Sequence, residues 1–124
     1  MELTLRDIHK DAIVSALAKA KQYRSLLEPE SAASICLDIL KIDPDHQEAT
    51  IIYILSLTDQ LHQAENQSQI KSIQTAINKL DSEYERHYYT GILNERRARF
   101  LLHQPMSRSF AYGYFEEAIE AFDK

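Results

Sequence analysis

The sequence predicts an all-α protein made of successive helix hairpins, and three observations lead to this prediction. Only 2 of the 124 residues are glycine and 3 are proline, so the chain has few of the residues that form β-hairpin turns. Apolar residues recur three or four positions apart, which is the spacing of one face of an α-helix. A helix and its end also recur at intervals of 38 and 42 residues, which is typical of an array of helix pairs. The three copies are Ile35, Ile39, Ile42 and Asp43; Ile73, Ile77, Leu80 and Asp81; and Phe115, Ile119, Phe122 and Asp123.

The first predicted hairpin covers residues 5–42. Thr4 followed by Asp7 resembles a helix capping box, so we expect the first helix to start near Leu5. Pro29 ends that helix and suits the first turn of the next, where a missing N–H is tolerated. The second helix then runs to about residue 42.

The second predicted hairpin covers residues 44–80. We expect Asp43 to cap a helix that starts at Pro44 and runs to about Gln63. Between residues 51 and 57 this segment is apolar on almost all sides, which indicates a helix that is buried on most of its surface. A break follows, and either Asn66 or Ser68 caps the fourth helix.

The third predicted hairpin covers residues 82–124. Ser82 and Glu85 form a capping box that opens a long helix to about His103. Gly91 lies inside this helix, at a cost of about 1 kcal/mol relative to alanine, so we expect a neighbouring helix to approach closely there. After a loop at residues 104–109, the sixth helix starts at Phe110 or Tyr112.

Composition argues against several functional classes. The net charge of −5 disfavours general nucleic-acid binding, which needs a local excess of lysine and arginine. No apolar run approaches the roughly 20 residues that span a bilayer, and the first residues do not resemble a secretory signal. Cys36 is the single cysteine, and we expect it to be a buried small hydrophobic residue. We therefore expect a cytoplasmic protein that binds neither nucleic acid nor membrane.

We expect no enzyme activity, no cofactor and no metal. The histidines are scattered, and the sequence has no glycine-rich phosphate loop and no nucleophile elbow. Two carboxylate–imidazole pairs at helical spacing, Asp43 with His46 and Asp59 with His62, are too few for a carboxylate-bridged metal site. There is no cysteine/histidine quartet for zinc.

Several segments resemble the tetratricopeptide repeat family, whose repeats pair two helices over roughly 34 residues. Residues 40–44, Leu-Lys-Ile-Asp-Pro, match the end of a repeat, and residues 115–122 resemble the start of a second helix with Ala118 at the crossing. Counting back from Pro44, the consensus small, aromatic and small positions hold Ala20, Tyr23 and Ala32. The resemblance implies a right-handed α-solenoid of about three antiparallel hairpins in one domain, residues 1–124. The intervals of 38 and 42 residues exceed the family period, and no polar capping helix follows the last hairpin.

This resemblance also implies a function, namely binding a peptide or helix of another protein in a concave groove. The groove positions carried over from the family are Leu17, Lys21, Arg24, Leu55, Thr58, Asp59, Tyr88, Ile92, Glu95 and Arg96. None of them is an asparagine, which argues against the grip on a C-terminal carboxylate that some members use. The arginines around residue 96 favour a salt-bridged helix face over a site for an acidic ligand.

Three alternatives remain at this point. The aromatic face of the last helix, at Phe115, Ile119 and Phe122, would pair two copies of the chain as a homodimer, or another chain would cover it if this sequence is a fragment of a longer protein. By size and acidity the chain is also similar to chaperones of bacterial secretion systems. A closed helical bundle would instead enclose a small ligand among its 7 tyrosines.

Overall fold

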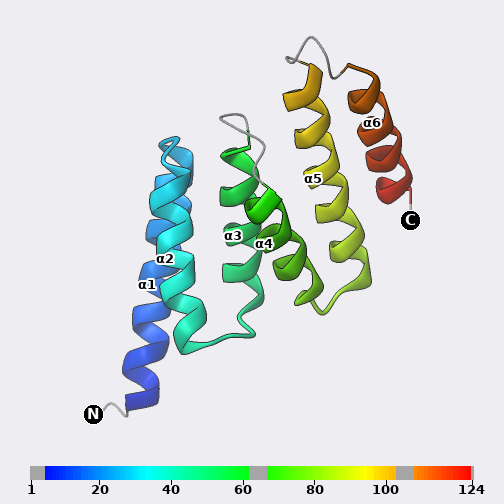
Figure 1. Ribbon diagram of the computed structural model, residues 1–124. Coiled ribbons are helices and arrows are strands. Elements are labelled where there is room, and N and C mark those ends of the chain that lie inside the picture. The colour runs from blue at the N-terminus through cyan, green and yellow to red at the C-terminus, as the bar shows by residue number, and fades with distance from the viewer. Residues whose placement is uncertain (1–4, 62–66, 103–107, 124) are drawn as a thin grey trace. The chain divides into compact units, whose positions relative to one another are not determined.

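The computed structural model describes residues 5–61, 67–102 and 108–123, and this part of the chain is helical with no strand (Figure 1). Its six helices are α1 (Leu5–Ser25), α2 (Pro29–Ile42), α3 (Gln47–Asp59), α4 (Gln67–Asn78), α5 (Glu83–Leu102) and α6 (Arg108–Phe122). The all-α prediction is therefore confirmed, and the predicted starts of the first, second and fifth helices are correct to within one residue.

The helices form two compact units, Met1–Ser56 and Leu57–Lys124. The division falls inside α3, so most of this helix belongs to the first unit and its last turn to the second. The predicted single solenoid, which requires a definite stacking of all three hairpins, stays a prediction.

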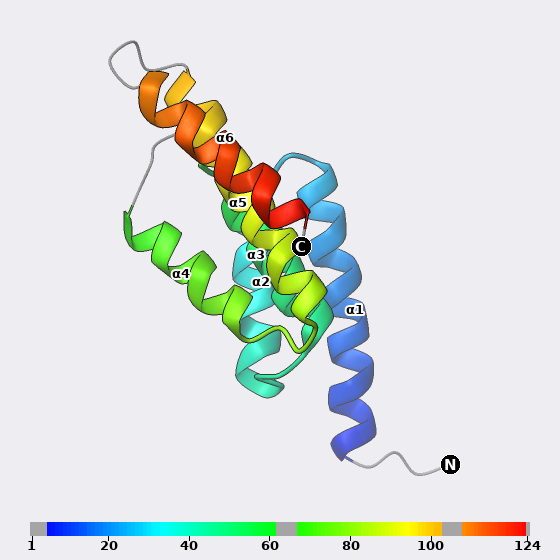
Figure 2. The same ribbon diagram turned by 90° about the vertical axis from the view of Figure 1, so that its right-hand side faces the viewer.

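In the first unit, α1 and α2 pack side by side as a hairpin (Figures 1 and 2). The small residues expected at the helix crossing, Ala20 and Ala32, are both fully buried. The core cluster consists of Leu17, Ala20, Cys36, Ile39, Ala49 and Ile52. Helices α1, α2 and α3 thus share an apolar core cluster.

The link between α1 and α2 is a tight turn that contains no glycine. The N–H of Glu28 donates to the carbonyl of Tyr23 at 2.9 Å, and the N–H of Leu27 donates to that of Arg24 at 3.1 Å. These two bonds form a Schellman motif, in which the residue after the helix adopts the left-handed conformation. Leu27 takes this position with φ 62°, and Pro29 then opens α2.

The start of α3 corrects the predicted cap. Asp43 ends α2 instead, because its N–H donates to the carbonyl of Ile39 at 2.9 Å. Pro44 lies in the turn that follows, which the N–H of His46 closes on the carbonyl of Asp43 at 3.1 Å. The Nδ1 atom of His46 accepts a hydrogen bond from the N–H of Ala49 at 3.1 Å, so His46 caps α3.

In the second unit, α5 packs against both α4 and α6. The predicted cap of α5 is confirmed, since Ser82 Oγ accepts a hydrogen bond from the N–H of Glu85 at 3.2 Å. Helix α6 starts at Arg108, which is earlier than predicted. The predicted cap Asn66 and most of the predicted loop at 104–109 lie outside the described residues.

Gly91 confirms the predicted close approach of a neighbouring helix. It is buried on α5, and a Cβ atom at this position would lie 2.6 Å from Cδ1 and 2.7 Å from Cζ of Phe122 on α6. Only glycine leaves room for that ring, and α5 and α6 pack together around it.

Candidate functional site

Unit Leu57–Lys124 exposes a cluster of large apolar side chains at one end of the α5–α6 hairpin. We call Tyr84, Tyr88, Ile119 and Phe122 the aromatic patch. Their exposed fractions are 69%, 41%, 62% and 41%, respectively. The ring of Tyr88 lies 6.3 Å from that of Tyr84 and 5.7 Å from that of Phe122, measured between centroids. Ring contacts therefore join Tyr84 and Tyr88 of α5 to Phe122 of α6, and Ile119 is three residues before Phe122, on the same side of α6.

The aromatic patch brings together residues that the sequence assigned to two different surfaces. Tyr88 was predicted for the partner-binding groove, and Ile119 and Phe122 for self-association. Phe115, the third residue of the self-association set, is half-buried on the same side of α6. The two predicted surfaces thus share side chains within this unit.

Charged residues in the second half of α5 form ion pairs. Glu95 forms an ion pair with Arg99 one helical turn away, and Asp59 lies 4.0 Å from Arg96. The Nε atom of Arg96 is buried without a hydrogen-bond partner among the described residues. These contacts agree with the predicted salt-bridged face of α5.

The remaining groove residues have different surroundings. Thr58 is only 1% exposed, so its side chain faces the interior and offers no surface to a partner, because α3 is apolar and buried on most sides. Ile92 is half-buried on α5. In the other unit, Lys21 is exposed and pairs with Glu48, whereas Arg24 and Leu55 are half-buried. A groove formed jointly by residues of both units stays a prediction.

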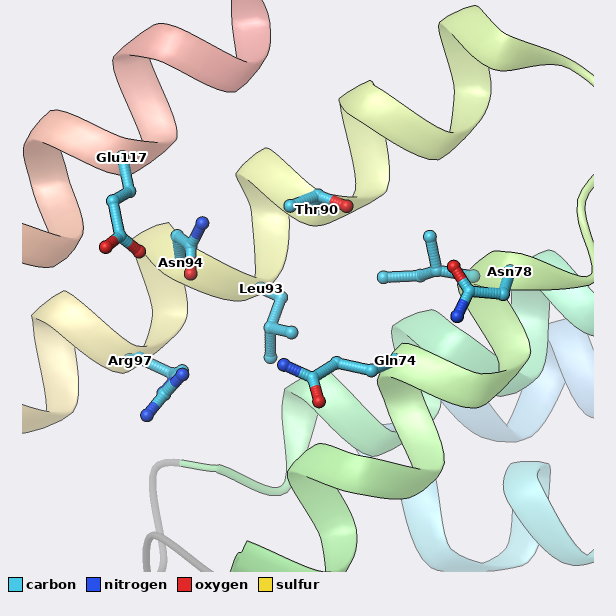
Figure 3. Close-up of a pocket in the computed structure, with 8 residues that line it drawn as sticks. Gln74, Asn78, Thr90, Leu93, Asn94, Arg97 and Glu117 are labelled. Carbon is cyan, nitrogen blue, oxygen red and sulfur yellow. The ribbon is translucent and has the colours of Figure 1, made fainter.

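A cavity lies on the opposite flank of α5, where the sequence predicted no site. Its volume is about 440 Å³, which is within the usual range for ligand sites. Figure 3 shows side chains from α4, α5 and α6 around it. The lining residues are Gln74, Ile77, Asn78, Thr90, Leu93, Asn94, Arg97 and Glu117.

Most groups that face this cavity are polar. Gln74, Asn78 and Asn94 contribute three carboxamides, Thr90 a hydroxyl, and Arg97 and Glu117 opposite charges. The hydroxyl of Thr90 donates to the carbonyl of Arg86 at 2.8 Å and keeps its lone pairs for a further partner. Arg97 is held by Tyr114, whose hydroxyl accepts a hydrogen bond from Nη2 and whose ring centroid lies 4.1 Å from Cζ.

Spacing along the helices was the signal that could have identified this cavity. Thr90, Asn94 and Arg97 occur at i, i+4 and i+7, which places them on one face of α5. Gln74 and Asn78 are likewise four residues apart on α4. A polar stripe on a helix that packs against neighbours on two sides indicates a lined cavity.

Cys36 lies in an apolar environment, as predicted. Its side chain is fully buried, and burial raises the pKa of the thiol to about 11. Burial also raises the pKa of the nearby Tyr53 hydroxyl, with a further contribution from Cys36. The thiolate is the reactive form, so Cys36 is chemically inert in the folded chain.

Among the described residues, no three histidine, cysteine, aspartate or glutamate side chains gather as they would to hold a metal ion. His62, from one of the two carboxylate–imidazole pairs, lies outside that part of the chain.

A second cavity, of about 420 Å³, lies in the first unit and contains a single tyrosine, Tyr23, in its lining. None of the helices, within the residues described, has the length and apolar character needed to cross a membrane.

Comparisons with protein-family models, with curated proteins and with solved structures returned no significant match.

Proposed function

We propose that this chain is a non-catalytic protein-binding module of the tetratricopeptide type, and that a peptide or helix of a partner protein docks on the aromatic patch. The observation that carries this proposal is the exposure of four large apolar side chains at one end of the α5–α6 hairpin, three of which are joined by ring contacts. Exposed apolar patches with a polar rim are typical of interaction sites.

The composition of the patch suits protein recognition. Tyrosine and phenylalanine supply a large contact area while losing little rotamer entropy, and tyrosine adds a hydroxyl for hydrogen bonding. The ring contacts among Tyr84, Tyr88 and Phe122 restrict these side chains before a partner arrives, which lowers the entropy cost of binding. The contact between His87 Nε2 and Glu83 Oε1, 3.5 Å apart in the first turns of α5, provides a polar rim beside Tyr84 and Tyr88.

The tetratricopeptide part of the proposal draws support from the helix pairs. Ala32 and Ala118, which the family register equates, are both buried, as the small residues at helix crossings should be. If the hairpins stack as in that family, Lys21 and Arg24 of the first unit would extend the binding surface. The localisation that we expect for such a module is the cytoplasm.

Self-association is the second candidate function, and the exposure of Ile119 and Phe122 favours it. A second copy of the chain would then cover the patch. Light-scattering mass measured over a range of concentrations separates the two proposals, because a mass that stays at 14.4 kDa excludes the homodimer.

A binding comparison tests the main proposal. The double variant Tyr84→Ala/Ile119→Ala removes the two most exposed members of the patch, and its matched control, Val14→Ala/Leu37→Ala, removes exposed apolar side chains of the first unit. Proteins captured by wild type from native lysate are identified, and their affinities for each variant are measured with purified components. We expect a loss of at least about tenfold for the patch variant and little change for the control. Equal affinities for both variants would contradict the proposal.

A further inference from the structure

The cavity formed by α4, α5 and α6 contains a polar group that the protein itself leaves unsatisfied. The Asn94 side chain is 9% exposed and lines the cavity, and within the described residues no hydrogen bond reaches its carboxamide. Buried polar groups in proteins nearly always have a partner. The Asn94 amide is little exposed, faces the cavity and has no partner in the described part of the protein, so it is available to a ligand with complementary hydrogen-bonding groups.

The lining identifies the class of ligand. A carboxamide presents a donor and an acceptor in one plane, as does the peptide group, so the two can pair through matching hydrogen bonds. Three carboxamides, from Gln74, Asn78 and Asn94, face the same cavity (Figure 3). We propose that this cavity binds the main chain of an extended peptide segment.

The spacing of the amides fits an extended chain. Gln74 and Asn78 are four residues apart on α4, which separates them by about 6 Å along the helix axis. In an extended chain, residues that point the same way are separated by about 6.7 Å. Consecutive carboxamides on the α4 wall can thus meet peptide groups two residues apart.

The other groups of the cavity complete this chemistry. Arg97 donates hydrogen bonds, which suits main-chain carbonyls, and the carboxylate of Glu117 accepts them, which suits main-chain N–H groups. Ile77 and Leu93 supply apolar surface for the Cα and Cβ atoms of the segment.

Other ligand classes fit this lining less well. The carboxylate of Glu117 disfavours an anion, and one carboxylate alone does not make a metal site. The six polar side chains also disfavour a purely apolar molecule.

This inference does not depend on the proposed function of the aromatic patch. On α6, Glu117 faces the cavity, whereas Ile119 and Phe122 are members of the aromatic patch. Helical geometry places Thr90, Asn94 and Arg97 on the side of α5 away from Tyr88 and Ile92. The two surfaces can therefore be disrupted separately.

A titration followed by NMR tests the proposal with three probes. The first is an N-acetylated, C-amidated hexapeptide of alternating alanine and threonine, and the second is the same peptide with every other main-chain nitrogen methylated. The third is free alanine. The readout is the side-chain NH₂ signals of Gln74, Asn78 and Asn94, with that of Gln67, an exposed residue of α4 outside the cavity, as an internal reference.

We expect the unmethylated hexapeptide to shift the three cavity signals and leave Gln67 unchanged. Methylation removes main-chain donors and should weaken binding about tenfold or more. The variants Asn78→Leu and Asn94→Leu should each lose binding to a similar extent, whereas the control Gln67→Leu should bind like wild type. Asn94→Leu removes an amide that has no hydrogen bond in the described part of the protein, so its melting temperature should equal or exceed that of wild type, which distinguishes lost binding from lost folding.

Three results would overturn the proposal. Equal binding of the methylated peptide would show that main-chain donors are not recognised. Equal binding of free alanine would make the cavity a site for small zwitterions. An absence of shifts at roughly 5 mM peptide, where a site of millimolar Kd is mostly filled, would show that the cavity does not bind main chain at all.

Discussion

The α1–α2 and α5–α6 hairpins have related sequence patterns but bury them differently. Ile39 of α2 and Ile119 of α6 occupy matching positions in the repeated isoleucine and phenylalanine pattern, although the tetratricopeptide register, which aligns Ala118 with Ala32, differs from this pattern by six residues. Ile39 is 2% exposed and Ile119 is 62% exposed. In α6, alanines at positions 118 and 121 face the interior instead, and the larger side chains remain at the surface. The first hairpin therefore buries these apolar residues, whereas the last leaves a set of them at the surface.

Substitutions at the equivalent isoleucines test this difference and should have the largest effect. Ile39→Ala should lower the free energy of unfolding by about 2–5 kcal/mol, because it leaves a cavity in the first unit. Ile119→Ala should change it by less than about 0.5 kcal/mol, because the side chain is largely exposed. Urea denaturation measures both values, and similar losses would mean that α6 buries the same face as α2.

Substitution of Gly91, which lies against the Phe122 ring, should have the next largest effect on the stability of the last hairpin. Gly91→Ala gains about 1 kcal/mol of helix propensity but forces the Phe122 ring to move, so we expect a net destabilisation of about 1–2 kcal/mol. In a Phe122→Ala background the overlap disappears, and Gly91→Ala should then stabilise the chain by about 1 kcal/mol. An identical effect in both backgrounds would disprove the close approach.

The caps of the two units allow a matched comparison of smaller effects. His46→Ala removes the acceptor at the start of α3, and Ser82→Ala removes the one at the start of α5. Each should cost about 1 kcal/mol, and His46→Asn should restore most of the loss because asparagine caps well. If His46→Ala is neutral while Asp43→Ala is costly, the predicted cap at Asp43 was correct after all.

The turn between α1 and α2 should give the smallest change, and it should be stabilising. Leu27 is 87% exposed with φ 62°, so Leu27→Gly relieves a left-handed backbone without losing buried surface. We expect a gain of about 0.5 kcal/mol after the larger entropy of glycine in the unfolded chain is subtracted. The control Leu26→Gly, at an ordinary backbone conformation, should be destabilising, and calorimetry measures both melting temperatures.

The helices could be predicted from the sequence because apolar periodicity and helix-ending residues are local features of the chain. Pro29, Ser82 and Gly91 each signalled a helix start or a close approach, and the structure confirms all three. The predicted cap of α3 was wrong because Asp43 can either end one helix or begin the next. Only the backbone geometry decides between these two roles. Leu27 gave no signal, since a left-handed turn is usually marked by glycine or asparagine.

The candidate sites were harder to predict because they depend on packing between helices. An asparagine such as Asn94 on a long polar helix is ordinarily exposed, and its burial follows from the positions of α4 and α6. The aromatic patch likewise appears only when Tyr88 and Phe122, which are 34 residues apart in sequence, meet at 5.7 Å.

The fully buried Cys36 has a practical consequence. It is the only thiol in the chain and lies in the first unit, so any reaction with a thiol reagent must await the opening of that unit. The rate of labelling at neutral pH therefore records how often the first unit opens, and no cysteine has to be introduced for this measurement. The second unit contains no cysteine and contributes no signal to this measurement. The labelling rate of the native cysteine therefore reports on the first unit alone.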